Sequence, residues 1–359
     1  MFRKTEPAQE EKALKIIHSY ITPELAWDVL KKLDKNRAPS QTIEYTRAPI
    51  INDLVFREGT VAGFAANFKA TGNIVVTLTN DNPRFWFFSH ADEISYLFKD
   101  RLDDKAVVLA PFCAHRAKAE YKATGLRFDS DPKGRVVAYG SIRTMEINSA
   151  HVPVFFSSEG SIQPGDRVVY HHPLTKMNDL LYGQLDNPAG VAACILAILA
   201  LKQLKDDLSV GFVFTDEEEG PSESNATFAR GAKRLRDRIS IPELCVVVDG
   251  HDVASDDSIS RAALYAEKSS NCRGTVVPPH LYNAFRKLLD ESEKTGIEVK
   301  ENTGYVSRSD DVACYEMTKN VLLVGYAVNN PHFNLAVPTA SLRAIVNLSK
   351  IIAWIALHA

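Results

Sequence analysis

Short apolar runs recur along the chain, and most of them stop at an acidic residue or a histidine. Apolar runs that do not alternate with polar residues are typical of strands covered on both faces of a sheet. A Gly72-Asn73 turn leads into a further strand. The pattern therefore predicts strands of one buried sheet over 74–76, 85–88, 210–215, 245–248 and 321–328.

Segments with apolar residues at spacings of three and four alternate with these runs and predict helices. Pro188 opens one of them, and the last carries a single apolar stripe from Leu342 to Ile355. The predicted helices cover 10–36, 188–205, 223–237, 280–294 and 339–357. This alternation indicates an α/β fold with a mixed, largely parallel central sheet flanked by helices. Ligands bind such sheets beyond the carboxyl ends of the strands.

The stretch 100–180 has a different pattern, in which short strand-like runs are separated by turn sequences. The turns are Asp131-Pro132-Lys133-Gly134 and Gln163-Pro164-Gly165-Asp166. We therefore expect a small β-rich, barrel-like domain over 100–180. It is inserted into a discontinuous α/β domain made of residues 1–99 and 181–359.

Composition narrows the classes of function. The chain has 359 residues, is 45% hydrophobic and carries a net charge of −3, which excludes a largely disordered protein and argues against nucleic-acid binding. The longest apolar run, Val191–Leu201, is too short for a membrane helix, and the N-terminal segment lacks the apolar core of a secretion signal. The five cysteines are dispersed, without a CxxC pair. We therefore expect a cytoplasmic protein with no membrane partner.

Residues of metal-ligand type stand at the predicted strand ends or in the adjoining loops: His90, Asp186, the acidic run 216–219, Asp249 and His332. Taken singly, each has an ordinary explanation. An aspartate before a helix fits an N-cap, four successive acids fit a solvated turn, and a loop histidine is usually structural.

Together these residues supply two histidines and three carboxylates at one edge of one sheet. This set suits two metal ions that share one aspartate, each ion taking one histidine and one further carboxylate. Mixed imidazole and carboxylate donors favour zinc, cobalt or manganese over calcium or magnesium. Two ions about 3.5–4 Å apart can clamp a water molecule and polarise a carbonyl group.

The motifs, in order, resemble those of the co-catalytic metallo-aminopeptidases, specifically the glutamyl aminopeptidase or tetrahedral (TET-type) aminopeptidase family. They are His90-Ala91-Asp92-Glu93-Ile94, 185–192, 214–220, Val248-Asp249 and His332. The TET-type enzymes insert a β-domain between the first histidine and the bridging aspartate, which here are 96 positions apart (186 − 90). The resemblance covers residues 70–340, and the residues before them match poorly.

The resemblance implies a site for two divalent metal ions. One ion would be held by His90, Asp186 and Asp249, and the other by Asp186, Glu218 and His332. Zn²⁺ is the expected metal, with Co²⁺ or Mn²⁺ as alternatives. The family also implies a cis peptide bond after the bridging aspartate.

By the same resemblance, Glu217 is the general base and Asp92 orients His90. The third glutamate of the run leaves a second register open, in which Glu218 and Glu219 are the base and the ligand. The first register is favoured because Gly220 then falls at the glycine of the family's EExG pattern.

Further polar residues have two interpretations. Related enzymes carry a Ser-Asp or Thr-Asp pair near the site, and Ser309-Asp310-Asp311 either corresponds to it or forms a plain turn or helix cap. His251 is a candidate to line the pocket. His115 and the pair His171-His172 are expected to be structural.

The implied activity is a dinuclear metal-dependent aminopeptidase that hydrolyses N-terminal residues from peptides with a metal-activated water. A homo-oligomer, with a dodecamer as one form, is also implied. A related amidohydrolase (a deacylase or carboxypeptidase) and a non-catalytic relative are the alternatives. The chain departs from the family at Pro188, where the family often has arginine, and at Phe333-Asn334, where Pro-Glu is common, and these changes touch the pocket and loops more than the ligands.

Overall fold

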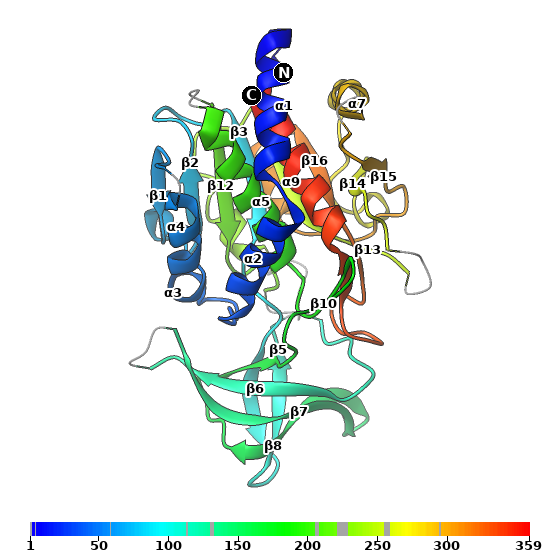
Figure 1. Ribbon diagram of the computed structural model, residues 1–359. Helices are drawn as coiled ribbons and strands as arrows, with labels where there is room; N and C mark the ends of the chain where they lie inside the picture. The colour runs from blue at the N-terminus through cyan, green and yellow to red at the C-terminus, as the bar shows by residue number, and fades with distance from the viewer. Residues whose placement is uncertain are drawn as a thin grey trace.

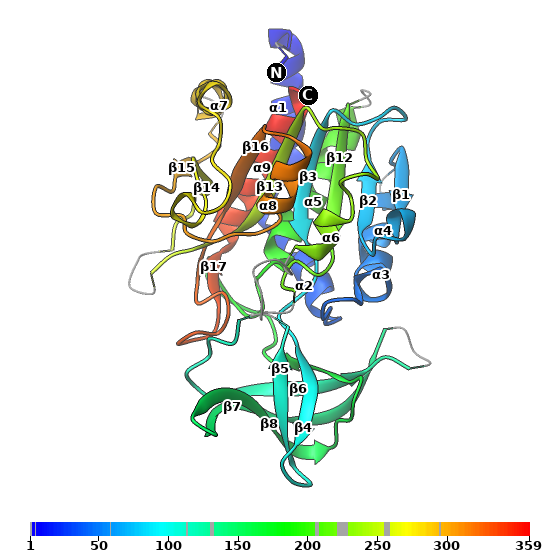
Figure 2. The same ribbon diagram turned by 180° about the vertical axis from the view of Figure 1, so that it is seen from behind.

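The computed structural model describes the chain except for residues 1, 4, 58, 113, 130–132, 205–207, 221–228, 255–258 and 294–295. An α/β domain stands on a small closed β-barrel, and both chain termini lie at the end far from the barrel (Figures 1 and 2). The backbone N–H of Arg3 donates to the carbonyl of His358 across 2.9 Å, so the two ends of the chain are in contact.

The α/β domain is built on one mixed sheet, as predicted. Its central strands run parallel to one another in the order β12, β3, β13, β16. Antiparallel strands complete both edges, and β14 and β15 join beside β16. All the predicted strands are present. The strands of this sheet are β1 (Gly63–Ala65), β2 (Ile74–Thr77), β12 (Val210–Thr215), β3 (Phe85–His90), β13 (Leu244–Asp252), β16 (Val321–Asn329), β17 (Thr339–Ser341), β11 (Leu180–Tyr182), β10 (Thr175–Met177), β14 (Ala263–Ala266) and β15 (Val299–Glu301).

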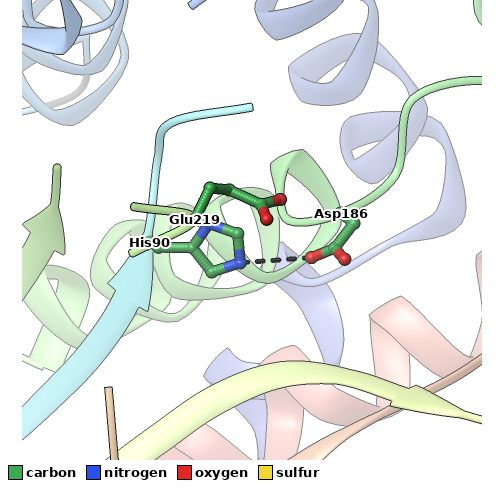
Figure 3. A group of neighbouring side chains, drawn as sticks. All are labelled: His90, Asp186 and Glu219. Carbon is green, nitrogen blue, oxygen red and sulfur yellow. Dashed lines mark hydrogen bonds and ion pairs between the residues drawn. The ribbon is translucent and has the colours of Figure 1, made fainter. Parts of the chain in front are cut away.

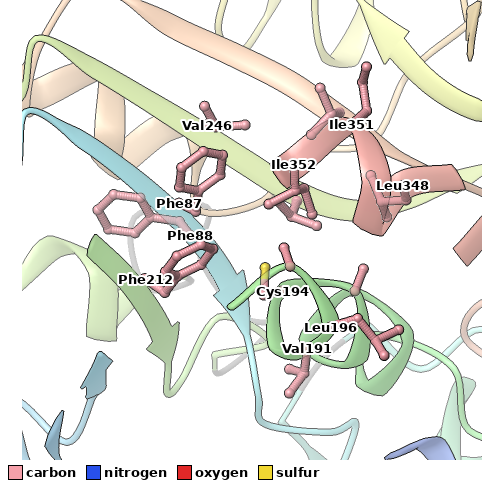
Figure 4. Packing of buried hydrophobic residues seen from close by; sticks show 14 of the residues in the cluster. Phe87, Phe88, Val191, Cys194, Leu196, Phe212, Val246, Leu348, Ile351 and Ile352 are labelled. Atoms are coloured by element: carbon pink, nitrogen blue, oxygen red, sulfur yellow. The ribbon is translucent and has the colours of Figure 1, made fainter. Parts of the chain in front are cut away.

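Helices cover both faces of this sheet. One face carries α1 (Pro7–Tyr20), α2 (Pro23–Asp34), α5 (Pro188–Leu201) and α9 (Leu342–Leu357), and the other carries α6 (Arg230–Lys233) and α8 (Asp311–Met317). Every residue of α5 is buried, because it packs between the sheet and the outer helices. The rings of Phe87 and Phe212, on neighbouring strands, stack at 4.9 Å between centroids and lie in the same apolar cluster as the residues of α5 and α9 shown in Figure 4. Three further helices lie at the sides: α3 (Ile43–Thr46), α4 (Ala48–Phe56) and α7 (Pro279–Glu293).

Some predicted helix boundaries were wrong. The helix predicted over 10–36 is two helices, because Pro23 starts a new one and the Thr22 hydroxyl caps it by accepting from Leu25 N (3.2 Å). The last helix begins at Leu342 rather than at 339, since 339–341 pair with the sheet as β17. Of the helix predicted over 223–237, residues 223–228 lie outside the described residues.

The barrel closes in the order β4-β5-β8-β7-β6-β9. Its strands are β4 (Tyr96–Arg101), β5 (Ala106–Pro111), β6 (Tyr121–Arg127), β7 (Arg135–Ile147), β8 (Ala150–Gly160) and β9 (Arg167–Tyr170). The barrel has its own apolar core, and Phe333 of the α/β domain belongs to that core. Strands β10 and β11, which follow the barrel in the chain, pair with the main sheet. Within the described residues, no helix has the length and apolar character needed to cross a bilayer.

Candidate metal centre

The residues predicted as metal ligands meet at the carboxyl ends of the parallel strands. His90 is the last residue of β3 and lies opposite Thr215, the last residue of β12. Asp249 lies in β13, and His332 follows β16. Asp186 and the acidic run are in the loops that precede α5 and follow β12. The sheet topology therefore gathers residues that are far apart in the sequence.

Asp186 lies between two histidines. Its Oδ1 atom is 3.1 Å from Nε2 of His90, and its Oδ2 atom is 3.4 Å from Nε2 of His332. Burial opposes the ionisation of Asp186, but hydrogen bonds to His332 and His90 hold the pKa of its carboxyl below the usual range. The two oxygens of one carboxylate thus face two different imidazoles.

Further carboxylates surround the ring of His90. Its Nε2 atom is 3.4 Å from Asp249 and 3.9 Å from Glu218. Figure 3 shows the carboxylate of Glu219 turned toward His90 and Asp186, and one ligand atom of each of these three residues lies within 4.8 Å of the others. Both Glu218 and Glu219 therefore reach the histidines.

These carboxylates repel one another in a site from which water is largely excluded. Burial raises the pKa of Glu218, and the charges of Glu219 and Asp249 add to this rise against the opposing charge of His90. Burial also raises the pKa of Glu219 to about 7 and the pKa of Asp249 above its usual value. The Oε1 atom of Glu219 is buried and has no hydrogen-bond partner among the described residues. Divalent cations would relieve the repulsion and engage this oxygen, so the residues fit the metal ions that the resemblance implies.

The loop that carries Asp186 is held by its neighbour. The peptide bond between Asp186 and Asn187 is cis, as the resemblance implied. The Asn187 side chain donates to Val248 O (2.9 Å) and to Ser89 Oγ (3.1 Å), and it accepts from Gly190 N (3.1 Å) to cap α5. This side chain thus ties α5 to strands β3 and β13 behind the site.

Asp92 holds the site together through more contacts than the sequence indicated. Its backbone carbonyl is 3.2 Å from Nδ1 of His90, and its carboxylate is 3.6 Å from the same atom. The carboxylate also accepts from Ser40 Oγ (2.5 Å) and from the backbone N–H groups of Glu218 (3.2 Å) and Glu219 (3.4 Å). Asp92 therefore joins the His90 loop to the acidic run.

The Glu217 side chain points elsewhere. It forms ion pairs with Arg234 and, at 2.9 Å, with Arg230. Its backbone has φ of +54°, a left-handed conformation that redirects this side chain relative to the next two. Of the three glutamates, Glu217 meets arginines, whereas Glu218 and Glu219 meet the histidines.

The Ser309-Asp310-Asp311 segment lies beside the centre. The hydroxyl of Thr215 donates to Asp310, which is fully buried, and burial raises the pKa of Asp310 to about 7. Asp311 is also buried, and its carboxylate accepts from Ser269 Oγ (2.8 Å), Thr275 N (3.1 Å) and Ser309 N (2.7 Å). Asp310 thus lies near the candidate ligands and Asp311 is bound to a neighbouring loop, and a role of the segment in the site stays a prediction.

Three of the histidines without a predicted metal role, His251, His115 and His171, pack against aromatic rings. His251 is buried and stacks on Tyr305 at 4.0 Å between ring centroids, and burial lowers its pKa to about 3. His115 contacts Tyr96 in the barrel. His171 packs edge-on against Tyr139 at 6.1 Å.

A segment from the poorly matching N-terminal region also supports the site. Gln41 N donates to Asp216 (2.8 Å), and Arg47, which is fully buried, pairs with Glu93 and donates from Nε to Ala91 O (3.3 Å). Sequence patterns gave no signal for these contacts, since a buried arginine is indistinguishable from an exposed one in sequence.

No protein-family model matches the chain, and no curated protein gives a significant match. Solved structures do match. The TET1 peptidase of Pyrococcus horikoshii is 20% identical with a TM-score of 0.71, over 93% of this chain and 99% of that one. An aminopeptidase of the archaeon Desulfurococcus kamchatkensis is 18% identical with a TM-score of 0.73, over 95% of each chain.

A protein from Thermotoga maritima named an endoglucanase also matches, with 16% identity and a TM-score of 0.59, over 90% of this chain and 95% of that one. At such identities the likeness establishes the fold, and the reaction has to be argued from the site. The chain therefore has the fold of the TET-type aminopeptidases, as its motifs led us to expect.

Proposed function

We propose that the protein is a dinuclear metal-dependent aminopeptidase that removes N-terminal residues from peptides. The observation that carries this proposal is the position of Asp186, whose two oxygens face His90 and His332 separately. A carboxylate that bridges two imidazole-containing donor sets is what a two-ion site requires. A hydrolase with a single metal ion would need no such bridge.

In this proposal one ion is held by His90, Asp186 and Asp249, and the other by Asp186, His332 and a glutamate. The contacts favour Glu219 as that glutamate and Glu218 as the general base, which is the second register left open by the sequence. Two ion pairs with arginines occupy Glu217, which speaks against the first register, with Glu217 as base and Glu218 as ligand. Zn²⁺ is the proposed metal, with Co²⁺ or Mn²⁺ as substitutes.

Bound divalent ions would polarise the scissile carbonyl and lower the pKa of water. Residues of the chain would transfer the proton of the attacking water. Glu218 is buried beside His90, in a position to take a proton from the attacking water and return it to the leaving amine. Asp92 acts as a positioning residue, because its carboxylate fixes the backbone of Glu218.

The proposal extends to assembly and location. The Pyrococcus horikoshii TET1 peptidase assembles into a tetrahedron or a large octahedral shell, and a related structure is a dodecamer. By analogy we propose a homo-oligomer, with twelve copies as the first form to test. We propose the cytoplasm as its location, since Cys194, Cys245 and Cys314 are buried free thiols.

A single experiment tests the activity. Protein depleted of metal with a chelator is reconstituted with Zn²⁺, Co²⁺ or Mn²⁺ and offered aminoacyl-anilides, N-acylated amino acids and a peptide digest. The expected result is metal-dependent release of N-terminal residues. Cleavage of only the N-acylated amino acids would indicate a deacylase. Absence of both ion binding and hydrolysis would favour a non-catalytic relative.

A further inference from the structure

Phe333, which directly follows the proposed ligand His332, packs inside the barrel domain. Its side chain is 1% exposed and belongs to the barrel core, together with residues such as Phe155. Its ring centroid is 4.2 Å from that of Tyr170 and 5.2 Å from that of Tyr121. A residue of the α/β domain therefore completes the core of the other domain.

The backbone around Phe333 is held tightly. Phe333 adopts φ of +57°, a left-handed conformation that is uncommon for an aromatic residue. Its N–H donates to Asn330 O (2.9 Å), and Lys118 N of the barrel donates to Asn334 O (3.0 Å). The loop after β16 is thus closed on itself before Phe333 and fastened to the barrel directly after it.

The surface that receives this ring is itself braced. The hydroxyls of Tyr170 and Tyr96 lie 2.6 Å apart, and Tyr96 in turn contacts Nδ1 of His115 (2.9 Å). Nε2 of His115 reaches the hydroxyl of Thr144 (2.8 Å). Tyr170 is therefore fixed by a chain of hydrogen bonds across the barrel, and it offers Phe333 a rigid partner.

We propose that Phe333 is a positioning residue, whose packing in the barrel core holds His332 where it faces Asp186. The barrel thereby determines how tightly the metal ion next to His332 is bound. This inference rests on the proposed function, because it assumes that His332 is a metal ligand. The competing interpretation is that Phe333 only fills the barrel core and has no effect on the site.

The test compares two truncations in the same core. Phe333→Ala removes the ring beside His332, and Phe155→Ala removes an equally buried ring that belongs to barrel strand β8. Both variants lower barrel stability, so they are matched for that effect. The readout is Co²⁺ binding to metal-depleted protein, followed by visible absorption and by equilibrium dialysis.

The wild type is expected to bind two Co²⁺ ions per chain. Phe333→Ala should bind the first ion normally and the second at least about tenfold more weakly. His332→Ala should also lose affinity for the second ion. Phe155→Ala should bind both ions as the wild type does. Phe333→Leu, which keeps an apolar side chain in the core, should recover most of the second affinity.

Two results would overturn the inference. One is an unchanged second affinity in Phe333→Ala, and the other is an equal loss in Phe155→Ala, which would indicate a general effect of barrel stability. A wild type that binds no second ion would refute the dinuclear function itself, and this is seen without any variant.

A reciprocal measurement does not depend on variants of the barrel core. If the barrel positions His332, then by linkage metal binding must stabilise the barrel. Adding Co²⁺ to the wild type should slow amide hydrogen exchange in β6 and β9, which carry Tyr121 and Tyr170. The same addition to His332→Ala should leave these strands unchanged, and equal protection in both proteins would contradict the proposal.

Discussion

The Oδ2 atom of Asp186 lies 3.4 Å from Nε2 of His332, although the two residues are 146 positions apart in the chain (332 − 186). One residue precedes α5 and the other follows β16, and the sheet brings them together. The other oxygen of the same carboxylate faces His90. Two ions bound on opposite sides of Asp186 would therefore share this one side chain.

Replacing the shared carboxylate should empty both metal positions. We expect Asp186→Asn to weaken the binding of both ions by more than about 100-fold, because an amide supplies neither the charge nor the second anionic oxygen. Asp249→Asn is the matched control and should mainly affect the His90 position. Metal analysis of the purified variants after dialysis measures this, and two ions retained by Asp186→Asn would contradict the bridging position.

Substitutions of the three glutamates should differ in their effects on kcat and on metal content. Glu218→Gln should lower kcat by about 10²–10⁴-fold while metal content stays at the wild-type level, since a general base contributes about this much. Glu219→Gln should lose one ion. Glu217→Gln should keep near-normal kcat, because its partners are Arg230 and Arg234. A large kcat loss in Glu217→Gln with full metal content would restore the first register.

The buried ion pair behind the site should matter for stability. Arg47→Met leaves Glu93 buried with the more distant Arg37, at 3.7 Å, as a partner, and should lower the free energy of unfolding by about 3–5 kcal/mol. Adding Glu93→Gln to this variant should recover part of the loss, because the buried carboxylate that lost Arg47 is gone. Urea unfolding measures both.

An exposed ion pair provides the control for the buried one. Lys32 and Asp53 lie 3.1 Å apart on the surface of the α/β domain. Lys32→Met should change the free energy of unfolding by less than about 1 kcal/mol. A loss as large as that of Arg47→Met would show that burial is not the cause.

The barrel should lose stability in acid through His115. Burial lowers the pKa of His115 from 6.5 to about 4. Between these values the unfolded chain binds a proton that the folded barrel does not, so stability falls as the pH drops from 6.5 toward 4 and is unaffected above that range. In metal-depleted protein, His115→Asn should show a shallower fall between pH 7 and pH 5. Identical pH dependence in the two proteins would contradict this assignment.

The strands, and the gathering of the candidate ligands at their carboxyl ends, could be predicted from the sequence because both follow from one pattern. A buried parallel strand is apolar throughout, and its carboxyl end opens into the crevice where ligands bind. His90 and Asp249 are polar residues at the ends of such apolar runs, so the sequence alone identifies them as candidates. The break at Pro23 was also readable, since Thr22 and Pro23 form a helix start signal.

The direction of neighbouring side chains could not be predicted in the same way. Three consecutive glutamates look alike in sequence, and only the left-handed backbone of Glu217 decides which of them meet the histidines. The insertion of Phe333 into the barrel is likewise invisible, because an apolar residue in a loop does not indicate which domain will bury it. Such contacts depend on tertiary packing rather than on local pattern.

The contact between Arg3 and His358 places the two chain ends side by side at the pole opposite the barrel (Figure 1). Chains whose ends meet tolerate circular permutation. A short peptide linker could join residues 359 and 1, and new ends could then be opened in an exposed barrel turn such as Asn148-Ser149. Fusion partners would then be attached to the barrel instead of at the far pole.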